Sequence, residues 1–171
     1  KCAPFDEVGP LAAGGEAVRL AAPGLARVAA VRRAVGPGVR LLVDCHSRFE
    51  AESAPEVASR LEEHDVGWFE EPVEPIEDID ALSHIAGQFA MPVAGGETGY
   101  GRGFFAELVA RRAVDVIMPD VVYCGGATEA HRAGRAAIES GCQVSLHSPS
   151  GPISQLASAH VTAALPGALA L

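Results

Sequence analysis

The chain has 171 residues, of which 49% are hydrophobic and 20% are charged, a composition typical of a globular domain with its own core. Its formal net charge is −9, which argues against a nucleic acid or an anionic membrane surface as the main partner. It has no apolar run long enough to span a membrane, and its four cysteines form no Cys-x-x-Cys pair. We therefore expect a cytoplasmic protein with reduced thiols, no membrane span and no zinc site.

Short apolar runs and helix-type patterns alternate along the chain. Residues 4–15 predict a loop, and residues 16–35 predict a helix that Pro23-Gly24 breaks or kinks. Ser53 has the position of an N-cap, with Glu56 at the capping-box position. The predicted strands are 39–43, 66–69, 91–94, 114–118, 143–146 and a run that begins at 168–171. The further predicted helices are 54–65, 76–89, 101–112, 127–140 and 153–164.

Strict alternation of apolar strands and helices predicts an α/β protein with a parallel sheet covered by helices. An open doubly wound sheet and a closed (β/α) barrel both fit this order of elements. We favour the barrel because polar residues end five successive strands, whereas an open sheet concentrates its chemistry at one switch point. A complete barrel needs about 250 residues, so we interpret residues 1–171 as a partial (β/α) barrel catalytic domain of roughly six βα units.

Five polar residues stand where successive apolar runs stop, in steps of roughly 25 residues, about the length of one strand, one helix and their loops. They are Asp44, Glu70, Glu97, Asp120 and His147. The carboxyl ends of all strands in a barrel surround one mouth, and we expect these side chains to gather there.

Three of these residues, Asp44, Glu70 and Glu97, are carboxylates that would repel one another at the mouth unless a cation neutralised them. Ligation by oxygen alone favours Mg²⁺, or Mn²⁺, over zinc, so we interpret the three as metal ligands. For any one of them alone, a solvated surface acid or an ion-pair partner is the simpler interpretation.

Asp120 and His147 end the next two strands. An Asp that accepts a hydrogen bond from one imidazole nitrogen fixes the tautomer and raises the basicity of the other nitrogen. We therefore predict that His147 is a general base oriented by Asp120. The alternative is a structural histidine beside an acid.

Together these motifs resemble the barrel domain of the enolase superfamily, in its mandelate racemase and muconate lactonizing branch. The motifs are Asp44, Trp-Phe-Glu70-Glu-Pro, Gly-Gly-Glu97, Met-Pro-Asp120 with Gly125-Gly126, and Leu-His147. The resemblance implies a Mg²⁺ ion on the three carboxylates, which stabilises an enediolate formed by removing the proton α to a carboxylate. It also implies that the His147–Asp120 pair is the base of the mandelate racemase subgroup, and that a capping domain, the first strand and the last barrel unit lie outside this chain.

The chain departs from this family pattern near its first residue. Many relatives end the second barrel strand with Lys-x-Lys or Lys-x-His, whose second member is a base on the opposite face of the substrate. Here Lys1 matches the first position, but Ala3 occupies the second. The departure disfavours a racemase with two bases, while Lys1 is still expected to contact the substrate carboxylate or the enediolate oxygen.

A second departure is His46, two residues after Asp44, on the same face if the strand continues. It resembles the general acid of acid-sugar dehydratases of the mannonate and gluconate type; a histidine that only supports a metal ligand or the loop is the equal alternative. One base and one acid suit elimination of water. We therefore predict a Mg²⁺-dependent acid-sugar dehydratase, a hydro-lyase, in which His147 removes the α-proton.

Arg48, Tyr100 and Arg102 follow strands that end in metal ligands and are predicted to contact the substrate, with solvated loop residues as the alternative. A racemase, an epimerase or a cycloisomerase on the same scaffold is the alternative function. A catalytically incompetent fragment and a zinc-dependent barrel hydrolase are alternatives of other classes. We expect a small-molecule carboxylate as the substrate and a homo-oligomer for the full-length protein.

Overall fold

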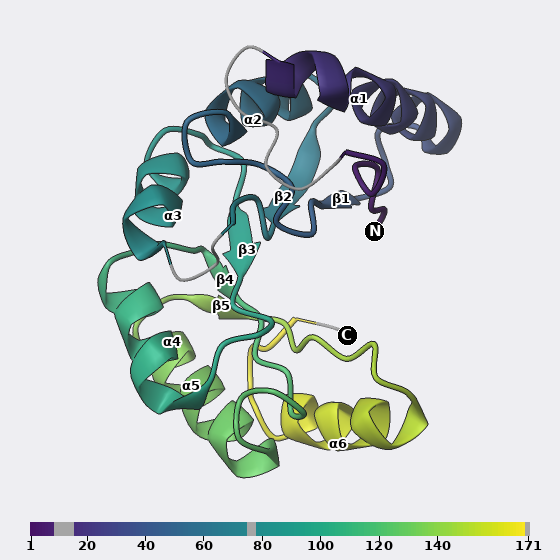
Figure 1. The fold of residues 1–171 in the computed structure, drawn as a ribbon. Coiled ribbons are helices and arrows are strands. Elements are labelled where there is room, and N and C mark those ends of the chain that lie inside the picture. Colours follow the sequence, from purple (N-terminus) through teal and green to yellow (C-terminus); the bar gives the residue numbers. More distant parts are fainter. Residues whose placement is uncertain (9–15, 75–77, 170–171) are drawn as a thin grey trace. The chain divides into compact units, whose positions relative to one another are not determined.

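The computed structural model describes residues 1–8, 16–74 and 78–169 (Figure 1). The chain divides into two compact units, residues 1–93 and residues 94–171. Within the described residues, no helix is long and apolar enough to cross a membrane. Three parts of predicted elements lie outside the described residues. They are residues 9–15 of the predicted loop 4–15, the start of the predicted helix 76–89 and the last two residues of the run 168–171.

The first unit contains α1 (Glu16–Val35), β1 (Leu41–Asp44), α2 (Ala54–Glu62), β2 (Val66–Glu70) and α3 (Ile79–Ala86). β1 and β2 pair in parallel, with Asp44 opposite Glu70. Cys2 forms an isolated parallel bridge to Val43, so the first residues of the chain line the other edge of β1. Figure 1 shows α1 and α2 side by side, and α2 packs on β2.

β3 (Val93–Gly95) begins at the last residue of the first unit and continues into the second unit. The second unit also contains α4 (Gly101–Ala110), β4 (Val116–Ile117), α5 (Ala127–Glu139), β5 (Gln143–Val144) and α6 (Pro152–Ala163). β4 pairs in parallel with both β3 and β5. α5 packs on α4, on α6 and on β5. An isolated parallel bridge joins Asp120 to His147 beyond the short strands, so the two residues continue the register of β4 and β5.

The strands are buried along almost their whole length. Leu41, Val43 and Asp44 of β1 are buried, as are all residues of β3 and β4. Parallel strands covered by helices are expected to show this continuous burial instead of an alternating pattern. The parallel pairing and the alternation of strands with helices confirm the predicted α/β class.

Helix α1 differs from the prediction because it continues through Pro23 without a break. Proline removes one helical hydrogen-bond donor, which normally favours a break or a kink. The buried face of α1 nevertheless runs on across this point, through Ala17, Ala21, Gly24 and Val28, at helical spacing. Packing of this continuous face offsets the lost hydrogen bond. The predicted break is wrong, and the alternative, a kink at Pro23-Gly24, stays a prediction.

The predicted capping box at the start of α2 is also wrong. Ser53 is the N-cap, but its side chain makes no capping hydrogen bond, and its hydroxyl donates to the Glu50 carbonyl oxygen at 3.2 Å. Its backbone is already helical, at φ −100° and ψ −25°, whereas a capping residue usually has an extended backbone.

Arg32, in the last turn of α1, forms hydrogen bonds to the backbone that follows α1 and to the backbone that follows α2. Its Nη1 donates to the carbonyl oxygens of Gly36 and Val39, at 2.9 and 2.7 Å. Its Nε and Nη2 donate to the carbonyl oxygens of His64 and Asp65, just beyond α2, at 2.9 and 2.7 Å. One guanidinium therefore satisfies four backbone carbonyl groups in the segments that follow the two helices.

We expect Arg32→Ala to lower the free energy of unfolding by about 2 kcal/mol, because four carbonyl oxygens lose a charged donor and water replaces it only in part. Urea unfolding followed by circular dichroism measures the change. The neighbouring exposed Arg33 gives the matched control, and Arg33→Ala should change stability by less than about 0.5 kcal/mol. Equal midpoints for the two variants would contradict the role of Arg32.

Candidate functional site

The predicted site residues are divided between the two units. The first unit holds Lys1, Asp44, His46, Arg48 and Glu70. The second unit holds Glu97, Tyr100, Arg102, Asp120 and His147.

Asp44 and Glu70 form a buried pair of carboxylates that share one cation. The parallel register of β1 and β2 places them opposite each other, and they are 3% and 0% exposed. The ammonium of Lys1 lies 2.5 Å from Glu70 Oε1 and 3.0 Å from Asp44 Oδ2. Burial alone would lower the pKa of Lys1, but the hydrogen bonds and charges of Glu70 and Asp44 outweigh it and raise that pKa above its ordinary value. Lys1 therefore neutralises part of the charge of the pair.

Trp68 holds the second oxygen of the Glu70 carboxylate. Its indole Nε1 donates a buried hydrogen bond of 3.0 Å to Glu70 Oε2. The two residues are two positions apart on β2 and so share a face of the strand. Trp68 was not among the predicted site residues, although its two-residue spacing from Glu70 on a predicted strand could have identified it.

The carboxylates of Asp44 and Glu70 fit a hard divalent cation. Their oxygens already converge on one positive centre, and Mg²⁺ prefers carboxylate oxygens as ligands. Within the described part of the chain, no group of three or more His, Cys, Asp or Glu side chains forms a metal-binding cluster. Glu97 belongs to the second unit, and the three-ligand site remains a prediction.

His46 lies beside Asp44, but for a different reason from the one predicted. β1 ends at Asp44, and His46 has a left-handed backbone with φ 47°, so the alternation of a strand does not extend to it. The turn nevertheless directs its Nε2 to 3.2 Å from Asp44 Oδ2. Its Nδ1 lies 2.5 Å from Asp6 Oδ1, a contact that the sequence analysis missed because loop residues have no periodicity to place them.

In the second unit, His147 and Asp120 form the predicted pair. His147 Nδ1 lies 2.9 Å from Asp120 Oδ2, and Asp120 is fully buried. The backbone N–H of Val122 donates to the other oxygen, Asp120 Oδ1, at 2.7 Å and fixes the carboxylate. His147 Nε2 lies 3.2 Å from Glu97 Oε2, so the imidazole connects two carboxylates at the ends of β3 and β4. An ionised carboxylate only accepts hydrogen bonds, so Asp120 selects the tautomer with hydrogen on Nδ1.

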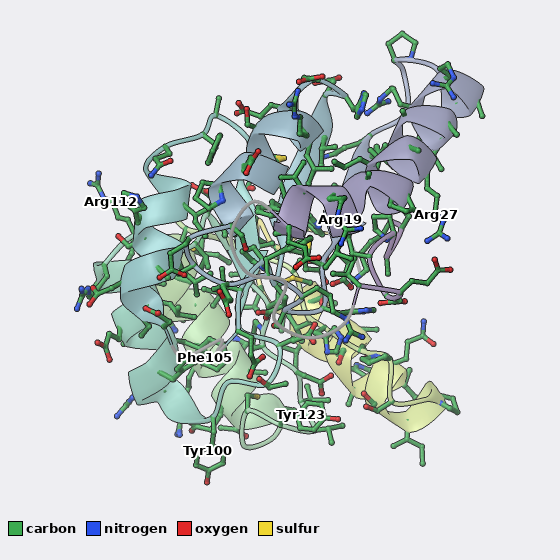
Figure 2. All side chains as sticks on the ribbon, turned by 45° about the horizontal axis from the view of Figure 1, so that its top comes forward. Arg19, Arg27, Tyr100, Phe105, Arg112 and Tyr123 are labelled. Carbon is green, nitrogen blue, oxygen red and sulfur yellow. The ribbon has the colours of Figure 1, made fainter. Side chains whose placement is uncertain are left out.

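The three predicted substrate contacts differ in their surroundings. Arg48 is half-buried, and its Nε is buried without a hydrogen-bond partner among the described residues. Tyr100 is 77% exposed and projects outward at the start of α4 (Figure 2). Arg102 is exposed and lines a groove between α4 and α5, together with Phe105 and Ala133. All three roles remain predictions.

A parallel α/β fold whose acidic and imidazole side chains follow the carboxyl ends of the strands defines a domain of the (β/α)-barrel class. The sequence matches the model of the family described as enolase C-terminal domain-like over residues 13–171. The chain belongs to this family, which confirms the predicted membership in the enolase superfamily.

Curated relatives include two enzymes named as dehydratases. The arabinonate dehydratase of Saccharolobus solfataricus is 36% identical over 81% of this chain and 37% of its own length. The D-xylonate dehydratase of Haloferax volcanii is 39% identical over 84% of this chain and 35% of its own length. The D-galactarolactone cycloisomerase of Agrobacterium fabrum is 36% identical over 70% of this chain and 32% of its own length. The chain thus spans about a third of the length of these relatives.

Among solved structures, the mandelate racemase/muconate lactonizing enzyme-like protein from Rubrobacter xylanophilus is 41% identical. Its TM-score is 0.84, over 90% of this chain and 39% of that one. This similarity agrees with the fold that the alternating elements predicted.

We expect Trp68→Phe to weaken Mg²⁺ binding about tenfold, because it keeps a buried ring but removes the N–H that orients Glu70. Isothermal titration of Mg²⁺ into the purified protein measures the affinity. The matched control is Phe69→Leu, which alters the neighbouring buried ring without removing a donor to Glu70 and should leave the affinity unchanged. An unchanged affinity in Trp68→Phe would show that the indole does not support a metal ligand.

Proposed function

We propose that this chain is the catalytic barrel part of a Mg²⁺-dependent dehydratase that acts on acid sugars. The observation that carries the proposal is the pair of His147 Nδ1 and buried Asp120 at 2.9 Å, which suits a general base. His46 supplies the acid that elimination needs in addition to a base. The names of the arabinonate and D-xylonate dehydratases support the same reaction class.

In the proposed reaction, His147 Nε2 takes the proton from the carbon α to the substrate carboxylate. The electron pair left behind forms a double bond as the carbon–oxygen bond at the β-carbon breaks. His46 gives a proton to the departing hydroxyl, which leaves as water. The resulting enol rearranges to a 2-keto-3-deoxy acid, so the overall change is the loss of one water and involves no oxidation or reduction.

The predicted metal ligands are Asp44, Glu70 and Glu97, and the proposed ion is Mg²⁺, with Mn²⁺ as its substitute. When bound, the ion would supply positive charge against the negative charge that develops on the substrate carboxylate. Lys1 lies against Asp44 and Glu70 and is proposed to contact the same carboxylate. Arg48, Tyr100 and Arg102 are proposed to contact the rest of the substrate.

A racemase or an epimerase is the weaker proposal because a two-base mechanism needs a second base on the opposite face of the substrate. The side chain at the corresponding position is Ala3, which has no ionisable group. A cycloisomerase needs no such base, and the similarity to a D-galactarolactone cycloisomerase keeps it as the second candidate function.

We further propose that the full-length protein is a cytoplasmic homo-oligomer whose partner is a small carboxylate. All four cysteines are free, which suits a reducing compartment.

The dehydratase proposal predicts that a panel of aldonic and aldaric acids, incubated in D₂O with Mg²⁺, contains at least one acid that yields a 2-keto-3-deoxy product. NMR detects the product, which takes up deuterium at C3 when the enol becomes the ketone, and it also detects any deuterium exchanged into the α-carbon of unreacted acid. Deuterium uptake with all hydroxyls retained and no keto product would contradict dehydration. A lactone opened or closed without loss of water would instead support the cycloisomerase.

With the substrate from that panel, His147→Ala should lower the rate of dehydration by about a thousandfold, because the reaction loses its base. Asp120→Asn should lower it by about ten- to a hundredfold, because the neutral amide no longer stabilises the positive charge that the imidazole gains when it takes the proton. The matched control is His160→Ala, which removes an exposed histidine of α6 and should leave the rate unchanged. Full activity in His147→Ala would contradict its role as the base.

A further inference from the structure

The imidazole of His46 is held between two carboxylates. Nδ1 lies 2.5 Å from Asp6 Oδ1, and Nε2 lies 3.2 Å from Asp44 Oδ2. Its backbone N–H also donates to Asp44 Oδ1 at 3.1 Å. The ring is 42% exposed on its side-chain surface, so packing alone does not fix its orientation. These polar contacts therefore decide where the ring points.

The backbone of the turn at residues 45–47 is strained, and hydrogen bonds join it to the residues at the end of β2. His46 and Ser47 have left-handed backbones, with φ 47° and 52°, which cost roughly 1–2 kcal/mol for residues other than glycine. The N–H of Cys45 donates to the Glu70 carbonyl oxygen at 2.9 Å, and the N–H of Ser47 donates to that of Glu71 at 2.7 Å. Strain that the surroundings maintain in this way is typical of functional sites.

The buried side chain of the preceding residue, Phe5, holds Asp6 in position. Phe5 is 1% exposed, and its ring packs edge-on against that of Phe49 with the centroids 5.2 Å apart. The segment that contains Phe5 packs closely on α1 at Gly24. A Cβ at Gly24 would lie 2.8 Å from the Pro4 carbonyl oxygen, so a larger residue there would collide with this segment. The anchored turn thus presents the Asp6 carboxylate to His46.

Arg27 of α1, which is labelled in Figure 2, also binds this turn. Its Nη1 donates to the Pro4 carbonyl oxygen at 3.1 Å, and its Nη2 lies 2.8 Å from both carboxylate oxygens of Glu7. Asp6 and Glu7 are therefore neighbouring acids with different partners, one bound to His46 and one bound to Arg27.

We propose that Asp6 is a positioning residue that orients the imidazole of His46 for proton donation to the departing hydroxyl. The inference rests on the proposed dehydration. The Asp6 carboxylate accepts from Nδ1–H and fixes the ring so that Nε2 points toward Asp44 and the buried carboxylates, not into solvent. In the second unit, Asp120 orients His147 in a similar way. The two histidines have opposite proposed roles, because His147 removes a proton and His46 donates one.

The test compares Asp6→Ala, Asp6→Asn and Glu7→Ala in the Mg²⁺-loaded protein. Asp6→Ala should lower kcat for dehydration about ten- to a hundredfold, with little change in KM, because the donor is no longer oriented. Removal of the α-proton, measured as deuterium exchange in D₂O, should continue because it depends on His147. Asp6→Asn keeps an oxygen that accepts from Nδ1–H and should retain most of the activity, and Glu7→Ala should match the wild type.

The same variants need a readout that does not depend on turnover. In ¹⁵N-labelled protein, the side-chain spectrum should show hydrogen on Nδ1 of His46 in the wild type and in Asp6→Asn. In Asp6→Ala that signal should change, while the signals of His147 should not. This spectrum tests the contact even if no acid sugar reacts, an outcome that would contradict the proposed function separately.

Three results would overturn the inference. The first is unchanged dehydration in Asp6→Ala. The second is an equal loss of deuterium exchange and dehydration, which would mean general damage to the site. The third is a His46 spectrum that Asp6→Ala leaves unchanged.

Discussion

Two carboxylates that face each other inside a protein must share positive charge, and the arrangement of the first unit follows from that constraint. Asp44 and Glu70 are opposite each other because β1 and β2 pair in parallel with this register. Both are buried, so water cannot screen their repulsion. Lys1 bridges them from the strand-like segment on the other edge of β1, and Trp68 binds the remaining oxygen of Glu70. The pair thus already shares one positive charge, which suits the proposed metal site.

Parallel pairing also determines what happens beyond the strand ends. Hydrogen bonds from the turn after β1 to Glu70 and Glu71 maintain the left-handed backbone of His46. In the second unit, an isolated parallel bridge beyond β4 and β5 brings Asp120 and His147 together. In both units, a histidine that follows a parallel strand is oriented by a carboxylate. The contacts differ in exposure, because the Asp120 side chain is fully buried and that of Asp6 is 55% exposed.

The sequence predicted what depends on strand order and missed what depends on loops. Asp120 and His147 could be paired in advance because parallel strands end at one edge and their spacing followed the βα repeat. His46 was expected near Asp44 through strand alternation, but a strained turn places it there. Asp6 lay in a predicted loop, and no periodic pattern links a loop residue to a turn that is distant in sequence.

The direct measurement of the central claim is isothermal titration of Mg²⁺ into the wild-type protein and into Glu70→Gln. The neutral amide keeps the size of the side chain but removes one of the charges that a divalent cation needs. The account predicts one binding site in the wild type and binding at least about tenfold weaker in Glu70→Gln. Equal affinities, or no binding by the wild type, would contradict the assignment of this buried carboxylate pair to a metal-dependent enzyme site.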